Sequence, residues 1–474
     1  MIDLKKLTIK KAHEDLKSGK YTAVDLTKAY LENIEKKDGD IHAYLEVYED
    51  CLERAKVVDR RIKNGEMTAL MGIPLSIKDN ILFEGHIASA SSKILENYRA
   101  TYDATIITKL KAEGAVIIGR TNMDEFAMGG STENSAFGPT KNPHDLSRVP
   151  GGSSGGAAAS VASEMALGAI GTDTGGSVRQ PASFCGVVAL KPTYGAISRY
   201  GLMAMGSSLD QVGPIAKTVT DVEILFRALQ GPDKYDATTI SYVVNDLPEK
   251  TKLRIGIPRE FLKTEGIDSE VLKNFEEALQ KFRLLGYEIK DVEMPNLPYA
   301  LSAYYILMPA EVSSNLARFD GIKYGLHKDG QNVVEDYFLS RRAGFGQEVR
   351  RRILLGTYVL SAGYYDSYYN KAVALRELIT TEYKNAFEEV DIIVTPTSPI
   401  PAFKLGEKSN NPLEMYLADI FTVPVNIAGV PGLSIPSGFK EMDGKKLPLG
   451  IQLVSAHQKE EILFRAGKDF LEEN

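Results

Sequence analysis

Two glycine-rich turns, each holding a serine, constrain this chain more than any other feature. Ser153 lies in GGSSGG and Ser177 lies in TDTGGSVR, and small residues and helix formers fill the segment between them. Glycine permits tight turns and lets a substrate approach the backbone closely. A serine after such a turn, at the start of a helix, has backbone N–H groups aimed at it, as a hydrolase needs to hold an oxyanion. One such motif is typical of a flexible loop, but two of them around an apolar unit favour a hydrolase site.

Helical and strand-like segments alternate on both sides of these turns, which predicts an α/β fold. A capping box at Thr22–Asp25 precedes a helix that carries Leu26, Tyr30 and Ile34. Further helices are expected at 48–64, 103–113, 269–285 and from about 459, and strands at 71–81, 114–122, 187–189, 253–257, 391–396, 432–438 and 449–455. Residues 231–252 are polar and predict a connection. We expect one domain over residues 1–474, in which a mixed sheet is covered by helices on both faces. The core that holds Lys78 and the two serine turns would span about 72–215, and the C-terminal half, with the substrate-recognition residues, about 253–474.

Charge and cysteine content narrow the class of protein. The 474 residues carry a net charge of −7, whereas a free-standing nucleic-acid binder is usually basic. Two cysteines, Cys51 and Cys185, form no disulfide framework, and the apolar neighbours of Cys185 predict a buried structural thiol. The charged N-terminal residues and the absence of a long apolar run predict a cytoplasmic protein without a signal peptide or a membrane-spanning helix.

No cofactor motif stands out in the chain. GAVIIGRT is close to a phosphate-binding loop, but Arg120 takes the place of the lysine, and the segment forms a strand after a helix instead of opening a helix after a strand. Dinucleotide and zinc-binding motifs are absent as well. We therefore expect this chain to hold no nucleotide, metal or other cofactor of its own.

A serine nucleophile needs a base, and Lys78 is the candidate. The six histidines lie in polar or turn contexts, outside the glycine motifs, and GxSxG is absent. Lys78 ends an apolar segment, where burial would disfavour its charged form. Acting as a base at neutral pH requires its pKa to fall by roughly 3 pH units from ~10.4, which costs about 4 kcal/mol. The residues alone leave two readings open, a surface lysine at a strand end and a buried base.

These motifs resemble those of the amidase-signature family of serine hydrolases. The resemblance rests on LSIKDNI, GGSSGG and GTDTGGSVRQP, and it extends over nearly the whole chain through MDEFAMGGSTENSAFGPTKNP, YYDSYYNKA, DIIVTPTSP and FTVPVNIAGVPGLSIPSG. The second group of motifs is similar to that of family members that use glutamine and act with tRNA.

The resemblance implies a role for each residue of a serine–serine–lysine triad. Ser177 matches the nucleophile, and Ser153 matches a serine that follows a cis peptide bond and relays protons between Ser177 and Lys78. Ser154 is adjacent, but the register of the motif favours Ser153. The oxyanion hole maps to backbone N–H groups at Thr174, Gly175, Gly176 and Ser177.

The resemblance also implies residues for substrate recognition. Arg352 would hold an α-carboxylate, since arginine pairs with carboxylates in a bidentate manner, and Asp419 would hold an α-amino group. Gly129 and Tyr304 are further candidates for the pocket. One departure is Ala88-Ser89-Ala90, where many family members have Thr-Thr-Cys, and we expect it to alter packing only.

The implied activity is that of a glutaminase working inside a tRNA-dependent amidotransferase. Ammonia freed from glutamine would convert misacylated Glu-tRNA(Gln) to Gln-tRNA(Gln) through a γ-phospho-Glu-tRNA(Gln) intermediate, and some relatives convert Asp-tRNA(Asn) in the same way. ATP with magnesium and the tRNA would belong to a B subunit, and a small C subunit would complete a heterotrimer. The alternative is a stand-alone amidase acting on small amides with the same triad. A silent scaffold is a third reading, which the intact triad disfavours.

Overall fold

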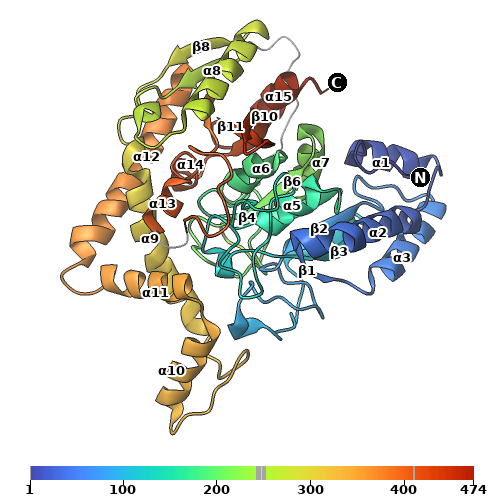
Figure 1. The fold of residues 1–474 in the computed structure, drawn as a ribbon, viewed down its shortest axis with the longest axis horizontal. Coiled ribbons are helices and arrows are strands. Elements are labelled where there is room, and N and C mark those ends of the chain that lie inside the picture. The colour runs from blue at the N-terminus through green and yellow to red at the C-terminus, as the bar shows by residue number, and fades with distance from the viewer. Residues whose placement is uncertain (1, 242–246, 248–251, 409–411, 474) are drawn as a thin grey trace.

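The computed structural model describes residues 2–241, 247, 252–408 and 412–473. An eleven-stranded mixed sheet runs through these residues in the order β1-β3-β2-β4-β6-β5-β10-β11-β9-β7-β8 (Figure 1). The strands are β1 Tyr44–Val47, β2 Pro74–Lys78, β3 Val116–Thr121, β4 Gly168–Asp173, β5 Val188–Lys191, β6 Gln211–Ala216, β7 Arg254–Ile257, β8 Glu288–Asp291, β9 Ile392–Pro396, β10 Gly432–Met442 and β11 Lys445–Val454. β2 is parallel to both β3 and β4, and β7 is parallel to both β8 and β9, whereas the other neighbours are antiparallel. The fold is therefore the mixed α/β sheet that the sequence predicts.

Helices cover both faces of this sheet. α5 (Gly155–Ala162) and α6 (Arg179–Cys185) contact each other and the central strands, and α7 (Val219–Leu229) packs with α15 (Glu460–Leu471) beside β5, β6 and β10. The remaining α-helices are α1 Ile9–Lys17, α2 Ala23–Ile41, α3 Cys51–Lys63, α4 Thr105–Ala112, α8 Ser269–Leu284, α9 Ala300–Asn315, α10 Val333–Gly344, α11 Gln347–Val359, α12 Asn370–Glu389, α13 Pro412–Leu417 and α14 Val423–Ala428. α10 extends away from the body of the protein (Figure 1).

Local sequence signals predicted part of these elements correctly, whereas β1, β4, β6 and β8 lie outside the strands that we expected. The capping box forms, because Thr22 Oγ1 accepts the N–H of Asp25 and the Asp25 carboxylate accepts the N–H of Thr22. α3, α4, α8 and α15 lie within the expected helical segments or one residue short of them. GAVIIGRT contains the buried strand β3, as expected, and Arg120 pairs with Asp79 and Glu46. Cys185 is buried.

The expected connection at 231–252 is described only in part. Asp233 accepts hydrogen bonds from Ser198 and Thr105, and Asp236 pairs with Arg199. This first portion is therefore anchored to the body of the protein. Residues 242–246 and 248–251 lie outside the described residues. No helix in the described ranges is long and apolar enough to cross a membrane.

Candidate active site

Lys78 lies at the end of β2, beside the turn that follows β4. β2 and β4 run parallel, so their carboxyl ends meet at one edge of the sheet, where α/β proteins commonly bind ligands. Lys78 is fully buried, and its Nζ donates to Ser153 Oγ at 2.7 Å and to the carbonyl of Thr172 at 3.2 Å. Burial lowers the pKa of Lys78 to about 7, although Asp124, Asp173 and Asp210 oppose this shift. Of the two readings that the residues left open, the structure selects the buried lysine.

The two adjacent serines of GGSSGG have different partners. Ser153 follows a cis peptide bond from Gly152 and accepts the hydrogen bond from Lys78. Ser154 Oγ instead donates to the carbonyl of Thr172 at 3.1 Å and accepts the N–H of Thr172 at 3.4 Å. Ser154 thus fastens the start of α5 to β4, while Ser153 is left facing the lysine.

The Ser177 turn lies against the Ser153 turn. The carbonyl of Ser177 accepts the N–H of Ser154 at 3.0 Å, and Ser177 is 7% exposed. In the described part of the chain the N–H groups of Thr174, Gly175 and Ser177 have no hydrogen-bond partner. Buried backbone N–H groups are rarely left without one, so three donors are available to a ligand beside Ser177.

Gly176 differs from the other predicted oxyanion donors. Its N–H donates to Asp173 Oδ1 at 2.8 Å and is therefore already used. Its φ of +136° is one that side chains rarely adopt, and a Cβ there would lie 2.2 Å from Thr422 Oγ1. Gly176 thus shapes the turn. In the described part of the chain, the backbone N–H groups that remain free to bind an oxyanion are those of Thr174, Gly175 and Ser177.

A buried ion pair that we did not predict supports this turn. Asp173 accepts from Arg179 Nε at 3.0 Å, Arg179 Nη2 at 2.9 Å and Asn426 Nδ2 at 2.9 Å. Burial alone raises the pKa of Asp173, but Arg179 and Asn426 bring it well below its usual range. Asp173 and Arg179 are the only charged residues between Glu164 and Lys191, and this isolation of two opposite charges was the signal that could have indicated their pairing.

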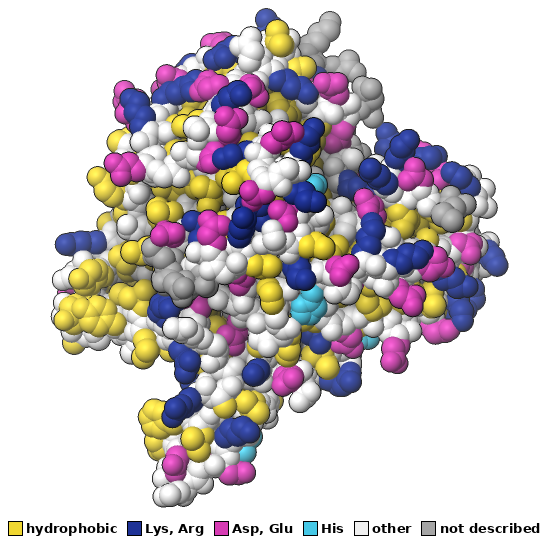
Figure 2. Space-filling view, viewed as in Figure 1, with side chains coloured by type: hydrophobic (Ala, Val, Ile, Leu, Met, Phe, Trp, Pro, Cys, Tyr) yellow, Lys and Arg dark blue, Asp and Glu magenta, His cyan; other side chains and the backbone are white. Residues whose placement is uncertain are grey.

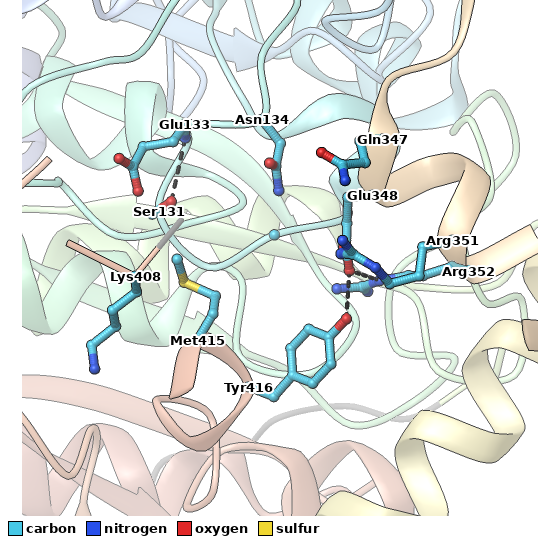
Figure 3. A pocket seen from close by; sticks show the side chains of 11 residues that line it. Ser131, Glu133, Asn134, Gln347, Glu348, Arg351, Arg352, Lys408, Met415 and Tyr416 are labelled. Carbon is cyan, nitrogen blue, oxygen red and sulfur yellow. Dashed lines mark hydrogen bonds and ion pairs between the residues drawn. The ribbon is translucent and has the colours of Figure 1, made fainter. Parts of the chain in front are cut away.

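Arg352 and Gly129 line one cavity of about 150 Å³ (Figure 3). Arg352 belongs to α11, and Gly129 belongs to the segment that follows β3. Arg352 Nε donates to Glu348 Oε1 at 2.8 Å, and the guanidinium lies over the rings of Tyr305 and Tyr416. A Cβ at Gly129 would lie 2.3 Å from the Asp124 carboxylate, so only glycine fits there.

Asp419 and Tyr304 lie beside the turn that holds Ser177. Asp419 Oδ1 is buried and has no hydrogen-bond partner in the described ranges. Burial raises the pKa of Asp419 well above its usual range, with a further contribution from Asp173. Thr422 Oγ1 lies within hydrogen-bond distance of the carbonyls of Asp419 and Gly175, and a Cβ at Gly175 would lie 2.8 Å from the Tyr304 ring. Asp419 also lies near the cavity, because its Oδ2 would be 3.7 Å from a Cβ at Gly130, the residue after Gly129.

Residues expected to take no part in the chemistry have structural partners instead. Ser89, within the Ala88–Ala90 departure, donates its N–H to Asp79 Oδ1 at 3.1 Å, and its hydroxyl binds the same carboxylate. This segment therefore serves packing. The ring of His144 donates to the carbonyl of Cys185 at 3.0 Å, and His86 packs against Tyr48 and Phe83.

Comparison with known proteins agrees with this geometry. The model of the family described as Amidase matches residues 25–464. The chain belongs to the amidase family. Relatives within this family include the A subunit of glutamyl-tRNA(Gln) amidotransferase from Desulfatibacillum aliphaticivorans, 51% identical over 98% of this chain and 97% of that protein, and the protein of the same name from Thermoanaerobacter pseudethanolicus, 53% identical over 96% and 94%.

Solved structures of amidase family members share the fold. The crystal structure of the glutamyl-tRNA(Gln) amidotransferase A subunit from Thermotoga maritima is 42% identical, with a TM-score of 0.82 over 100% of this chain and 96% of that one. The peptide amidase of Stenotrophomonas maltophilia is 28% identical, with a TM-score of 0.81 over 99% and 97%. The family thus contains proteins named as amidotransferase subunits and as amidases.

Proposed function

We propose that this chain is the glutamine-hydrolysing A subunit of a glutamyl-tRNA(Gln) amidotransferase. The observation that carries the chemistry is the buried hydrogen bond between Lys78 Nζ and Ser153 Oγ, beside a turn that offers Ser177 and three free N–H groups. The relatives of that name, more than 50% identical over nearly the whole chain, support the choice of substrate.

Acylation begins with a proton relay. Lys78, whose pKa is about 7, supplies a neutral amine at physiological pH. Ser153 passes its hydroxyl proton to Lys78 and takes the proton of Ser177, so that Ser177 Oγ can attack the side-chain carboxamide carbon of glutamine. The N–H groups of Thr174, Gly175 and Ser177 stabilise the oxyanion that forms.

The relay then runs in reverse to complete acylation, and deacylation by water follows. The tetrahedral intermediate breaks its C–N bond, the nitrogen takes a proton from Ser153, and ammonia leaves. Water then attacks the γ-glutamyl ester of Ser177, gives its proton to the relay and releases glutamate. Arg352 and Asp419 would hold the α-carboxylate and the α-amino group of the substrate, with Gly129 and Tyr304 shaping the pocket between them.

Use of the ammonia requires other subunits. Forming an amide from a carboxylate needs activation by ATP, and holding tRNA needs many phosphate contacts, which a chain of net charge −7 does not favour. We assign ATP with magnesium and misacylated tRNA to a B subunit, with a C subunit completing a cytoplasmic heterotrimer. The surface is compatible with such a complex, because large apolar side chains are exposed on α10 and α11 and in the tyrosine-rich segment that follows α11, where Figure 2 shows them gathered toward the left and lower edges.

A rescue experiment tests the proposal. The complex is assembled with Ser177→Ala and supplied with ATP, misacylated tRNA and either glutamine or ammonium chloride. Ammonium should restore Gln-tRNA(Gln) formation and glutamine should not. Glutamine-dependent product from the Ser177→Ala complex, or failure of ammonium to rescue it, would contradict the proposal.

A comparison of two substrates distinguishes the proposed function from the alternative, a stand-alone amidase. Arg352→Ala and Asp419→Ala should each raise the KM for glutamine sharply and affect a small amide such as propionamide much less, because propionamide has no zwitterionic end. Equal effects on both substrates would mean that these residues serve structure and do not bind the zwitterion, which would remove this argument against the stand-alone amidase.

A further inference from the structure

The two residues proposed to recognise the substrate zwitterion, an arginine and an aspartate, are both buried in one region of the protein. Arg352 is 4% exposed and lines the cavity together with Gly129, and Asp419 Oδ2 would lie 3.7 Å from a Cβ at the adjacent Gly130. Burial raises the pKa of Asp419 well above its usual range, and Arg352 opposes this shift. Two such groups tend to pair with each other, because each is costly to bury without a partner. A direct pair would neutralise both and close the site to a free amino acid. In this structure they do not pair, and Asp419 Oδ1 has no partner in the described ranges.

Glu348 holds Arg352 in place. On α11 it lies one helical turn before Arg352, and its Oε1 accepts from Arg352 Nε at 2.8 Å and from Tyr416 Oη at 2.8 Å, while its Oε2 pairs with Arg351 (Figure 3). Tyr416 stacks on Tyr305 with ring centroids 3.9 Å apart, and the guanidinium of Arg352 lies over both rings.

The remaining contacts of Arg352 leave one side of the guanidinium open. Nη1 lies 3.7 Å from the sulfur of Met308, and within the described residues Nη2 has no hydrogen-bond partner. Glu348 thus occupies Nε and balances the charge, while Nη2 remains available to a carboxylate in the cavity that Glu348 and Arg352 both line.

We infer that Glu348 is a positioning residue that keeps Arg352 away from Asp419, so that the recognition cation and the recognition anion both stay available for the two ends of a free amino acid. This inference rests on the proposed function. Without Glu348 the buried guanidinium would lose its anionic partner, and Asp419, which lies beside the same cavity, would be an acid available to replace it. The two recognition groups would then pair with each other.

Glutamine binding to catalytically inactive protein tests this inference directly. In a Ser177→Ala background, calorimetry gives the Kd for glutamine with no turnover. Glu348→Ala should raise this Kd by at least about tenfold, because Arg352 is no longer held open. Asp419→Asn should also weaken binding on its own. The two substitutions together should raise the Kd little more than Glu348→Ala alone, because Asp419 is already paired with Arg352 once Glu348 is removed.

Asp469 provides a matched control. On α15 it accepts from Arg465 Nε, four residues earlier, at 3.2 Å, and from Tyr287 Oη at 2.6 Å, so it holds an arginine and a tyrosine as Glu348 does. Asp469→Ala should leave the Kd for glutamine unchanged, whatever it does to thermal stability. Glu348→Gln keeps an acceptor for Arg352 and Tyr416 without the charge and should give a smaller rise in Kd. If Glu348→Ala does not fold, the Kd of Glu348→Gln tests the inference in its place.

Three outcomes overturn the inference. An unchanged Kd in the folded Glu348 variant does so, and so does a double variant whose weakening equals the product of the two single effects. Either result leaves the proposed function intact. If the Ser177→Ala protein with Glu348 in place binds no glutamine, the proposed substrate is wrong and the inference falls with it.

Discussion

At the scale of single residues, the environment of Lys78 turns an ordinary lysine into a base. Its Nζ has only Ser153 Oγ and the Thr172 carbonyl as partners among the described residues, and burial lowers its pKa to about 7. The amine is protonated below this pH and neutral above it. We expect kcat/KM for glutamine to fall as the pH drops through about 7 and to level off above it. Lys78→Arg should be inactive from about pH 6 to 9, since guanidinium stays protonated, and activity in that variant would point to another base.

The neighbouring serines should respond differently to the same substitution. Ser153→Ala removes the relay to Lys78, and we expect glutaminase kcat to fall by at least about a thousandfold. Ser154→Ala removes two hydrogen bonds to Thr172 and should lower the free energy of unfolding by about 1–3 kcal/mol, with a far smaller effect on kcat. Initial rates and urea unfolding of both variants measure this, and a reversed pattern would assign the relay to Ser154.

At the scale of elements, the turn between β4 and α6 depends on Gly176. Alanine there would adopt φ of +136° and place its Cβ 2.2 Å from Thr422 Oγ1. Gly176→Ala should therefore lower both kcat and the melting temperature, because the N–H groups beside Ser177 move with the turn. Gly363→Ala is the control, since φ is +86° and no atom lies within 4 Å of its Cβ. The control should lose about 1–2 kcal/mol of stability and keep its kcat, and an equal loss of kcat in both variants would argue against this role of Gly176.

At the scale of the whole molecule, Arg179 joins the serine-bearing half to the C-terminal half. Besides Asp173 it donates to the carbonyl of Thr422 at 3.0 Å and to the side chains of Gln452 and Asn426. Removing one partner of a buried pair leaves an uncompensated charge. Arg179→Met should cost about 3–5 kcal/mol of unfolding free energy, measured by urea denaturation near neutral pH. An unchanged midpoint would show that the halves are held together by other contacts.

The Asp173–Arg179 ion pair also makes the stability of the folded protein depend on pH in the acid range. Arg179 and Asn426 keep the pKa of Asp173 well below its usual range in the folded protein, against the effect of burial. A carboxyl with a depressed folded pKa contributes its stability above the unfolded pKa of about 4 and loses it as the pH falls further. The contribution is therefore complete at neutral pH.

The sequence by itself determined the elements with strong local signals and the motif that carries the chemistry. The capping box at Thr22, the buried run of β3 and the end of β2 at Lys78 are all encoded by neighbouring residues. β6 was missed because Gly213 and Pro214 argue against a central strand. Gly213 and Pro214 do pair with Gly171 and Ile170 of β4, but β5 pairs only with Ile215 and Ala216, so Pro214 needs no hydrogen bond on the β5 side.

Only the tertiary structure decided which groups of the site are free and which are used. Ser153 and Ser154 are the same residue type in the same motif, and the approach of β2 and β4 alone gives one to Lys78 and the other to Thr172. The N–H of Gly176 is taken by Asp173, and Arg352 is held by Glu348. Such assignments depend on distances between segments far apart in the chain. A sequence supplies the donors and acceptors, but packing selects the pairs, because each buried polar group must find its partner among those that the fold brings within reach.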